Sequence, residues 1–96
     1  MARQKFSSKQ TFAVLKVLLE CDQVHGYAIV RETGLDEGTV YPILKRLEKA
    51  GYLDAQWEFT SERGPPRKMF TLNAAGVQLT RERLRARQVE LTSERR

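Results

Sequence analysis

The chain has 96 residues, a mass of 11.1 kDa and a formal net charge of +5. A chain of this length forms one small domain around one core, which leaves little volume for a separate catalytic cavity. Hydrophobic residues make up 41% and charged residues 30%, a composition that excludes a disordered chain. The single cysteine excludes an intramolecular disulfide, so a cytoplasmic location is the simplest interpretation. No apolar run is long enough for a membrane span or a signal peptide.

Positive charge is concentrated toward the two ends of the chain. Residues 1–19 contain four basic and no acidic residues, and residues 80–96 contain six arginines and three glutamates. Residues 20–79 carry more acidic than basic groups. The chain is therefore not uniformly basic. An anionic partner such as nucleic acid would contact basic residues at particular positions on the surface.

Two helices are predicted near the start of the chain. The first begins with a capping box formed by Ser7 and Gln10 and continues, apolar on most sides, to about Cys21. The second runs from about Gly26 to Thr33, and the glycine that follows is a natural helix end.

A third helix is predicted from Asp36, a favourable N-cap residue, to about Ala50, with Gly51 as its terminator. A turn of about three residues centred on Gly34 and Leu35 separates it from the second helix. Two helices joined in this way form a helix-turn-helix.

The hydrophobic pattern then changes from a helical to an alternating period. A strand with one apolar face is predicted because polar residues alternate with Leu53, Ala55, Trp57 and Phe59. On this face we expect Trp57 to belong to the core. The segment 61–66 contains one glycine and two prolines and predicts a turn, and residues 67–72 predict a second strand. A β-hairpin that follows a helix-turn-helix is a wing.

A long helix is predicted after the hairpin, from residue 74 to about residue 94, with Asn73 as its N-cap. Three apolar residues recur seven positions apart in it, at Val77, Leu84 and Leu91. A helix of about 20 residues spans about 30 Å, which is longer than the core needs for cover. We therefore expect this stripe to mediate dimerisation with a second copy of the chain.

The third predicted helix has an apolar face and an opposite face that is polar and basic. At 100° per residue, four aliphatic side chains between residues 40 and 47 lie together. The other face offers donors for phosphates and for base edges in a DNA major groove, around a glycine that permits close approach. These candidate DNA-binding residues are Gly38, Thr39, Tyr41, Pro42, Lys45, Arg46 and Lys49. An ordinary solvated face is the alternative interpretation.

The tip of the predicted hairpin is a second basic site. Three cations flank a stiff diproline turn and could lie along a phosphate backbone or enter a minor groove. The candidate DNA-binding residues here are Arg63, Gly64, Pro65, Arg67 and Lys68. The alternative is a turn that only contributes to solubility.

Catalysis and metal binding have little support in the sequence. His25 is the only histidine and Cys21 the only cysteine, which are too few ligands for a zinc site within one chain. Neither a nucleophile motif nor a glycine-rich phosphate loop is present. We expect no enzymatic activity, no metal and no cofactor, and we interpret His25 as a residue that starts a helix.

Several motifs resemble the PadR family of bacterial transcriptional regulators, over roughly residues 8 to 77. They are His25-Gly26-Tyr27, the segment 34–48 with Gly-Thr-Val-Tyr-Pro at 38–42, Gly51-Tyr52-Leu53, Trp57, Gly64-Pro65-Pro66-Arg67-Lys68 and Phe70-Thr71-Leu72. The resemblance implies a winged-helix homodimer that binds double-stranded DNA at a pseudo-palindromic operator, usually as a repressor. It implies a recognition helix between Gly38 and Arg46, a wing from Gly64 to Lys68, and dimerisation through the C-terminal helix.

The predicted fold is therefore mainly α with a small β-hairpin, a winged helix-turn-helix plus one long C-terminal helix. Residues 1–72 are predicted as a winged-helix DNA-binding domain with a basic N-terminal arm, and residues 73–96 as a C-terminal dimerisation helix. Longer members of the family have a larger helical domain after the wing. The predicted C-terminal helix here has no aromatic residue on which a flat compound could stack. A small-molecule effector is possible but unsupported.

Two other interpretations remain open. Winged helices can bind partner proteins, and the net acidic middle of the chain is compatible with a protein–protein interaction module. A helix on a membrane surface would use the arginines of residues 81–87, but its apolar stripe lacks the Trp and Phe expected there. We therefore expect no membrane partner.

Overall fold

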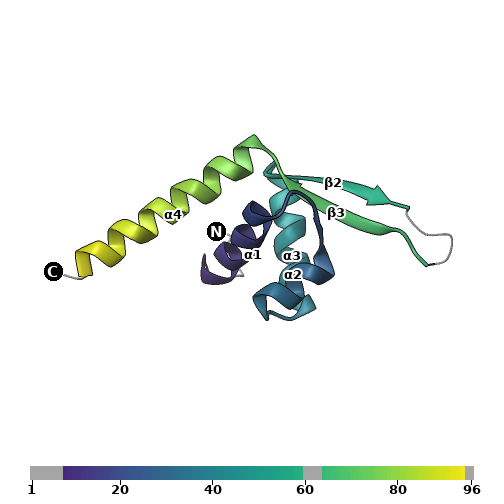
Figure 1. The fold of residues 1–96 in the computed structure, drawn as a ribbon, viewed down its shortest axis with the longest axis horizontal. Helices are drawn as coiled ribbons and strands as arrows, with labels where there is room; N and C mark the ends of the chain where they lie inside the picture. Colours follow the sequence, from purple (N-terminus) through teal and green to yellow (C-terminus); the bar gives the residue numbers. More distant parts are fainter. Residues whose placement is uncertain (1–7, 60–63, 95–96) are drawn as a thin grey trace, which may run out of the picture.

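A computed structural model describes residues 8–59 and 64–94 of the protein, and the side chains of residues 9–59 and 64–88. Three helices form the body, with a hairpin and a fourth helix that project from it in different directions (Figure 1). The molecule measures 57 × 30 × 24 Å. In chain order the elements are α1 (Ser8–Glu20), β1 (Val24–His25), α2 (Gly26–Thr33), α3 (Glu37–Lys49), β2 (Leu53–Glu58), β3 (Arg67–Leu72) and α4 (Ala74–Glu94). The predicted winged-helix class is confirmed.

The two helices of the helix-turn-helix end where glycine was expected to end them. Gly34 follows α2 with a φ of 77°, and its amide donates to the carbonyl of Val30 at 2.9 Å. Gly51 follows α3 with a φ of 89°, in the left-handed region that favours glycine. The Tyr52 amide then donates back to the Leu47 carbonyl at 3.0 Å, which completes a Schellman motif. The chain can therefore turn sharply from α3 into β2.

The capping residues predicted for the helix starts are confirmed less completely than those for the helix ends. Asp36 has the extended backbone of an N-cap residue before α3, but its side chain makes no capping hydrogen bond. His25 precedes α2, and its Nδ1 accepts the Ala28 amide at 3.3 Å, as a residue that starts a helix does. The predicted capping box of α1 depends on Ser7, which lies outside the described residues.

The sheet has three antiparallel strands in the order β1-β3-β2, so the predicted hairpin gains a short third strand. Strand β1 pairs Val24 with Phe70 and His25 with Met69. Because β1 leads directly into α2, this pairing holds the start of α2 beside the root of the wing. A strand of two residues has too short a pattern to be predicted from alternation.

The expectation that Trp57 belongs to the core is wrong. Along β2 the face that carries Leu53 becomes progressively exposed, from 3% at Leu53 to 55% at Trp57, and Phe59 beyond the strand is 75% exposed. The hairpin extends past the helices that cover its root (Figure 1), so the apolar face continues where the core has ended. The alternation of apolar and polar residues predicts which side chains share a face of the strand. It does not predict how much of that face the neighbouring helices cover.

The core lies between the three helices and the root of the sheet. Helix α1 contributes Val14 and Leu15, both fully buried, and α3 contributes its whole aliphatic face. Burial of one such side chain stabilises the fold by roughly 1.5–3 kcal/mol. The core comprises Val14, Leu15, Leu18, Val24, Ile29, Val40, Ile43, Leu44, Leu47, Leu53, Phe70 and Leu72.

Helix α4 joins this body through its first turns and through packing against α1. The Asn73 side chain accepts the Gly76 amide at 2.9 Å and donates to the Gly51 carbonyl at 2.8 Å, which ties the start of α4 to the end of α3. Thr80 is fully buried and donates to the Gly76 carbonyl at 2.8 Å. Further along, the Arg87 guanidinium lies 5.1 Å from the centre of the Phe12 ring on α1. None of the described helices is long and apolar enough to cross a membrane.

Candidate nucleic-acid interface

The outward face of α3 is arranged as its sequence predicts. Its aliphatic residues between 40 and 47 are buried, whereas the polar face is open to solvent. Thr39 is half-buried, and the remaining predicted residues are exposed: Gly38, Tyr41, Pro42, Lys45, Arg46 and Lys49. The core thus fixes one side of α3 and presents the other as a continuous surface.

Pro42 lies inside α3 and changes the hydrogen bonding of that surface. Proline has no amide hydrogen, so the carbonyl of Gly38, four residues earlier, lacks its usual helical donor. Both residues are exposed. The exposed face of α3 therefore carries two kinds of hydrogen-bonding group. Its side chains provide cationic and hydroxyl donors, and the Gly38 carbonyl is an acceptor that Pro42 cannot satisfy.

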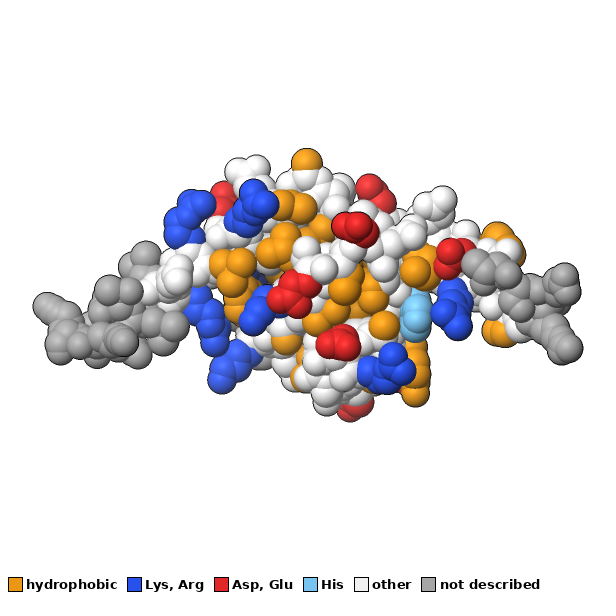
Figure 2. All heavy atoms as spheres, viewed as in Figure 1, with side chains coloured by type: hydrophobic (Ala, Val, Ile, Leu, Met, Phe, Trp, Pro, Cys, Tyr) orange, Lys and Arg blue, Asp and Glu red, His pale blue; other side chains and the backbone are white. Residues whose placement is uncertain are grey.

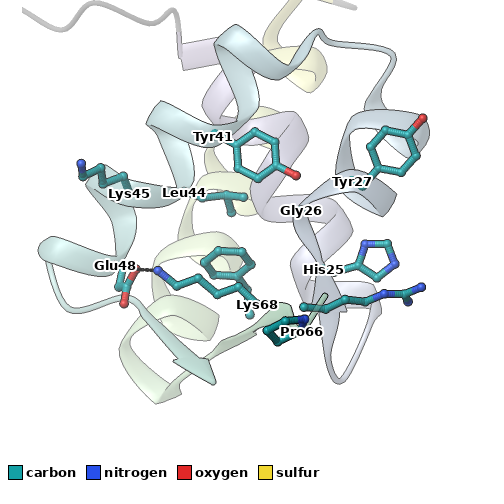
Figure 3. Close-up of a pocket in the computed structure, with 11 residues that line it drawn as sticks. His25, Gly26, Tyr27, Tyr41, Leu44, Lys45, Glu48, Pro66 and Lys68 are labelled. Atoms are coloured by element: carbon teal, nitrogen blue, oxygen red, sulfur yellow. Dashed lines mark hydrogen bonds and ion pairs between the residues drawn. The ribbon is translucent and has the colours of Figure 1, made fainter. Parts of the chain in front are cut away.

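A pocket of about 610 Å³ lies between α3, the start of α2 and the root of the wing (Figure 3), and we call it the α3–wing pocket. Figure 3 shows Tyr41 directed toward the start of α2, and Lys45 directed away from the centre of the pocket. The pocket is lined by His25, Gly26, Tyr27, Tyr41, Leu44, Lys45, Glu48, Pro66, Arg67, Lys68 and Phe70. The structure thus brings the predicted recognition helix and wing to the two sides of one concave surface.

Lys68 connects the wing to α3. Its ammonium lies 3.4 Å from Glu48 Oε1 (Figure 3), and 5.9 and 5.7 Å from the ring centres of Trp57 and Phe70. Both side chains of the ion pair are more than a third exposed, so the pair contributes little to stability, roughly 0–1 kcal/mol. It does hold the Lys68 charge on the pocket wall and partly neutralises it. Glu48 was not among the predicted site residues, because its partner is 20 positions away in the chain.

Tyr41 places a hydroxyl beside Gly26 at the junction of α3 and α2 (Figure 3). Burial, and then the charges of Glu37 and Tyr27, raise the pKa of the Tyr41 phenol above its ordinary value of 10.0. The hydroxyl therefore stays protonated at neutral pH and can donate a hydrogen bond. The Tyr41 residue as a whole is 42% exposed.

His25 is used in the fold and also faces the α3–wing pocket. Its Nδ1 accepts the Ala28 amide, so a neutral imidazole carries its proton on Nε2. Across residues 8–59 and 64–94, no group of three or more His, Cys, Asp or Glu is placed to hold a metal ion. Sequence reasoning missed His25, Gly26 and Tyr27 as pocket residues. The only signal for them was their place in a motif of the resembling family.

The predicted wing and dimerisation residues are only partly described. Gly64, Pro65 and Arg67 are exposed, whereas Arg63 lies outside the described residues. On α4, Val77 packs partly against the core of its own chain, and Leu84 is half-buried. The side chain of Leu91 lies outside the described part.

A family model and several solved structures indicate the family of this chain. A family model described as the transcriptional regulator PadR-like family matches residues 14–82. A PadR-like transcription factor from Bacteroides fragilis has 27% identity and a TM-score of 0.75, over 90% of this chain and 85% of that one. A PadR family transcriptional regulator from Eggerthella lenta has 29% identity and a TM-score of 0.66, over 84% and 75%.

Bacillus subtilis PadR, solved in complex with operator DNA, shares the fold at 22% identity with a TM-score of 0.72, over 83% of this chain and 48% of that one. Comparison with curated protein sequences finds no match. The match of the family model extends over well more than half of the chain. The chain therefore belongs to the PadR-like family of transcriptional regulators and is not an enzyme.

Proposed function

We propose that this protein acts in the cytoplasm as a homodimeric repressor that binds a pseudo-palindromic DNA operator. Helix α3 enters the major groove, and the wing lies along the phosphate backbone or in the adjacent minor groove. The observation that carries the proposal is the α3–wing pocket, a concave surface with the exposed face of α3 on one side and the basic wing on the other.

The charges around this surface suit an anionic backbone. Lys45 and Lys49 on α3 and Arg67 on the wing are exposed, and each can neutralise one phosphate. Among the described residues that line the pocket, the carboxylate belongs to Glu48, which is paired with Lys68. Within the pocket, DNA would therefore meet cations and the protonated Tyr41 hydroxyl, whereas the exposed carboxylate of Glu37 lies at the start of α3 and outside the pocket lining.

A second copy of the chain is part of the proposal because α4 extends far beyond its own contacts. In Figure 1 it projects from the body on the side opposite the hairpin. Pairing of two such helices about a two-fold axis would place the α3 helices at half-sites roughly 34–36 Å apart. The solved complex of Bacillus subtilis PadR with operator DNA supports the part of the proposal that concerns operator binding. A small-molecule effector remains without a supporting observation.

The first test is selection of a duplex from a random pool by the wild-type protein. We expect an enriched duplex with two related half-sites, bound about 10³-fold more tightly than a scrambled duplex of the same composition. The alanine variants of Lys45, Lys49 and Arg67 should each lower the salt slope of binding by about one unit. Lys16→Ala is the matched control, because Lys16 is exposed on α1 and does not line the α3–wing pocket.

A protein-interaction module is the second candidate, and exposed aromatic residues favour it. Trp57 is 55% and Phe59 75% exposed, and both lie toward the free end of the hairpin. Aromatic side chains of this kind are enriched at protein–protein interfaces. A pool that yields no enriched duplex, together with no binding of any duplex at low salt, would favour this candidate over the DNA-binding regulator.

A further inference from the structure

Two residues from different family motifs contact each other at the edge of the α3–wing pocket. Gly26 is the first residue of α2 and is buried, and Tyr41 lies on α3 with its ring against Gly26 (Figure 3). A Cβ atom added to Gly26 would lie 2.8 Å from Cζ and 2.9 Å from the hydroxyl oxygen of Tyr41. Distances below 3.0 Å essentially never occur for a real Cβ atom, so any side chain at position 26 would displace this ring.

The backbone does not explain why glycine stands at position 26. Among the described glycines only Gly34, Gly51 and Gly64 have a positive φ, so the conformation at Gly26 is open to any residue. Gly26 is also the first residue of a helix, a position that other residues occupy readily. The steric contact with the Tyr41 ring is therefore the feature that favours a missing side chain, because any larger residue would move the ring out of this position.

The contact determines where a DNA-facing hydroxyl lies. Tyr41 is 42% exposed, and an exposed tyrosine samples several rotamers unless something holds it. The flat surface of Gly26 permits the ring to lie across the junction of α2 and α3, with its hydroxyl beside the start of α2. Fixing the ring before binding removes part of the entropy cost of ordering it on DNA.

We propose that Gly26 is a positioning residue for Tyr41, and that this contact sets the part of DNA sequence discrimination that depends on Tyr41. The inference rests on the proposed function, because it assumes that α3 reads DNA. It assigns no DNA contact to Gly26 itself. It also explains why His25-Gly26-Tyr27 and Gly-Thr-Val-Tyr-Pro at 38–42 occur together in one chain, since the glycine of the first accommodates the tyrosine of the second.

The experiment places Gly26→Ala in three backgrounds: wild type, Tyr41→Phe and Tyr41→Ala. Each variant is assayed by fluorescence anisotropy on the duplex enriched by the wild-type protein and on its scrambled counterpart, and the ratio of the two dissociation constants is compared. The clash involves ring carbons that phenylalanine retains. Gly26→Ala should lower the ratio about tenfold in the wild-type background. It should lower it less than about twofold in Tyr41→Phe, where the clash remains but no hydroxyl is left to place, and in Tyr41→Ala, where the ring is absent.

A spectroscopic measurement tests the contact without DNA. The α-protons of Gly26 should show a ring-current shift in the NMR spectrum that persists in Tyr41→Phe and disappears in Tyr41→Ala. If Gly26→Ala fails to fold, urea unfolding of the double variant replaces the binding assay, and Tyr41→Ala should restore folding. Gly38→Ala is the control for stability, because its Cβ would meet only Asp36 Oδ1 at an ordinary 3.7 Å.

The possible failures are distinguishable. An equal loss of discrimination from Gly26→Ala in all three backgrounds, or unchanged Gly26 α-proton shifts in Tyr41→Ala, would overturn the positioning role and leave the proposed function standing. Failure of the double variant to refold would overturn it too. A wild-type protein that enriches no duplex would contradict the proposed function, and this inference with it.

Discussion

Helices α3 and α4 are both rich in basic residues, yet the structure supports them in different ways. Helix α3 has two faces along its whole length. Its cations are exposed on one face, and the other face is buried and consists of Val40, Ile43, Leu44 and Leu47. In helix α4 the contrast is between the first part of the helix, which is partly buried, and the later part, which is exposed. The buried residues of α4, such as Thr80, lie in its first two turns, and from residue 81 to 88 its surface is exposed and mostly basic apart from half-buried Leu84. Figure 2 shows several Lys and Arg side chains on this side of the molecule.

This difference indicates which parts of the site one chain can build alone. The face of α3 is fixed by the core behind it and by Lys68 and Tyr41 at its side, so it is prearranged in a single chain. Beyond residue 80, the described side chains of α4 are exposed except for half-buried Leu84, so this part of the helix lacks a buried face like that of α3. In the proposed dimer a second copy of the chain would supply that layer, so we expect the dimer and the proposed DNA interface to be disrupted by different substitutions.

The largest expected effect comes from charges placed on α4. Leu84→Asp combined with Leu91→Asp should dissociate the proposed dimer by more than about a hundredfold in Kd, because each change would bury an unpaired carboxylate in the interface. Circular dichroism should remain that of a winged helix. Sedimentation velocity measures the state of association, with Arg81→Asp at an exposed position as the control. A variant that still sediments as a dimer would exclude this stripe from the interface.

The next largest effect concerns the attachment of α4 to the body. A Cβ at Gly76 would overlap the Tyr52 carbonyl and lie 2.6 Å from Leu72 Cδ2. Gly76→Ala should lower the free energy of unfolding by about 2 kcal/mol, because the backbone of Tyr52 cannot move away cheaply. Urea denaturation measures this loss. Ala75→Gly at the exposed neighbouring position is the control and should cost at most about 1 kcal/mol; equal losses would show that the close packing at Gly76 is unimportant.

A smaller effect is expected from the ion pair between α3 and the wing. Glu48→Gln should release Lys68 and strengthen binding to both the selected and the scrambled duplex a fewfold. The salt slope should increase by up to about one unit, opposite in sign to the effect of Lys49→Ala. Glu82→Gln, which removes a carboxylate from the exposed surface of α4, is the matched control. Weaker binding by Glu48→Gln would mean that the pair positions the wing.

The smallest effect is on the ionisation of Tyr41. Its raised pKa means that the folded state favours the neutral phenol, so this contribution to stability is complete below pH 10 and is lost as the pH rises through the folded pKa. The difference in absorbance at 295 nm between wild type and Tyr41→Phe should therefore titrate above pH 10. A difference that titrates below pH 10 would contradict the burial and charge environment described for Tyr41.

The sequence predicted most of the fold, because local signals determine it. Gly34 and Gly51 end two helices, and the alternation of apolar and polar residues from Leu53 predicts a strand. These three elements could therefore be located without the structure. The exposure of Trp57 could not be predicted, since it depends on where the helical layer stops. The contact of Gly26 with Tyr41 and the pair of Lys68 with Glu48 join residues 15 and 20 positions apart, and no local pattern encodes them.

The most direct test of the central claim is anisotropy of the wild-type protein on its selected duplex and on the scrambled duplex, over a series of salt concentrations. We predict a preference of about 10³-fold that persists at physiological salt, because base contacts from α3 add to the phosphate contacts of both surfaces. Equal binding of the two duplexes, with a steep loss as salt rises, would mean that only phosphates are contacted. That result would contradict the account of α3 as a helix that reads sequence.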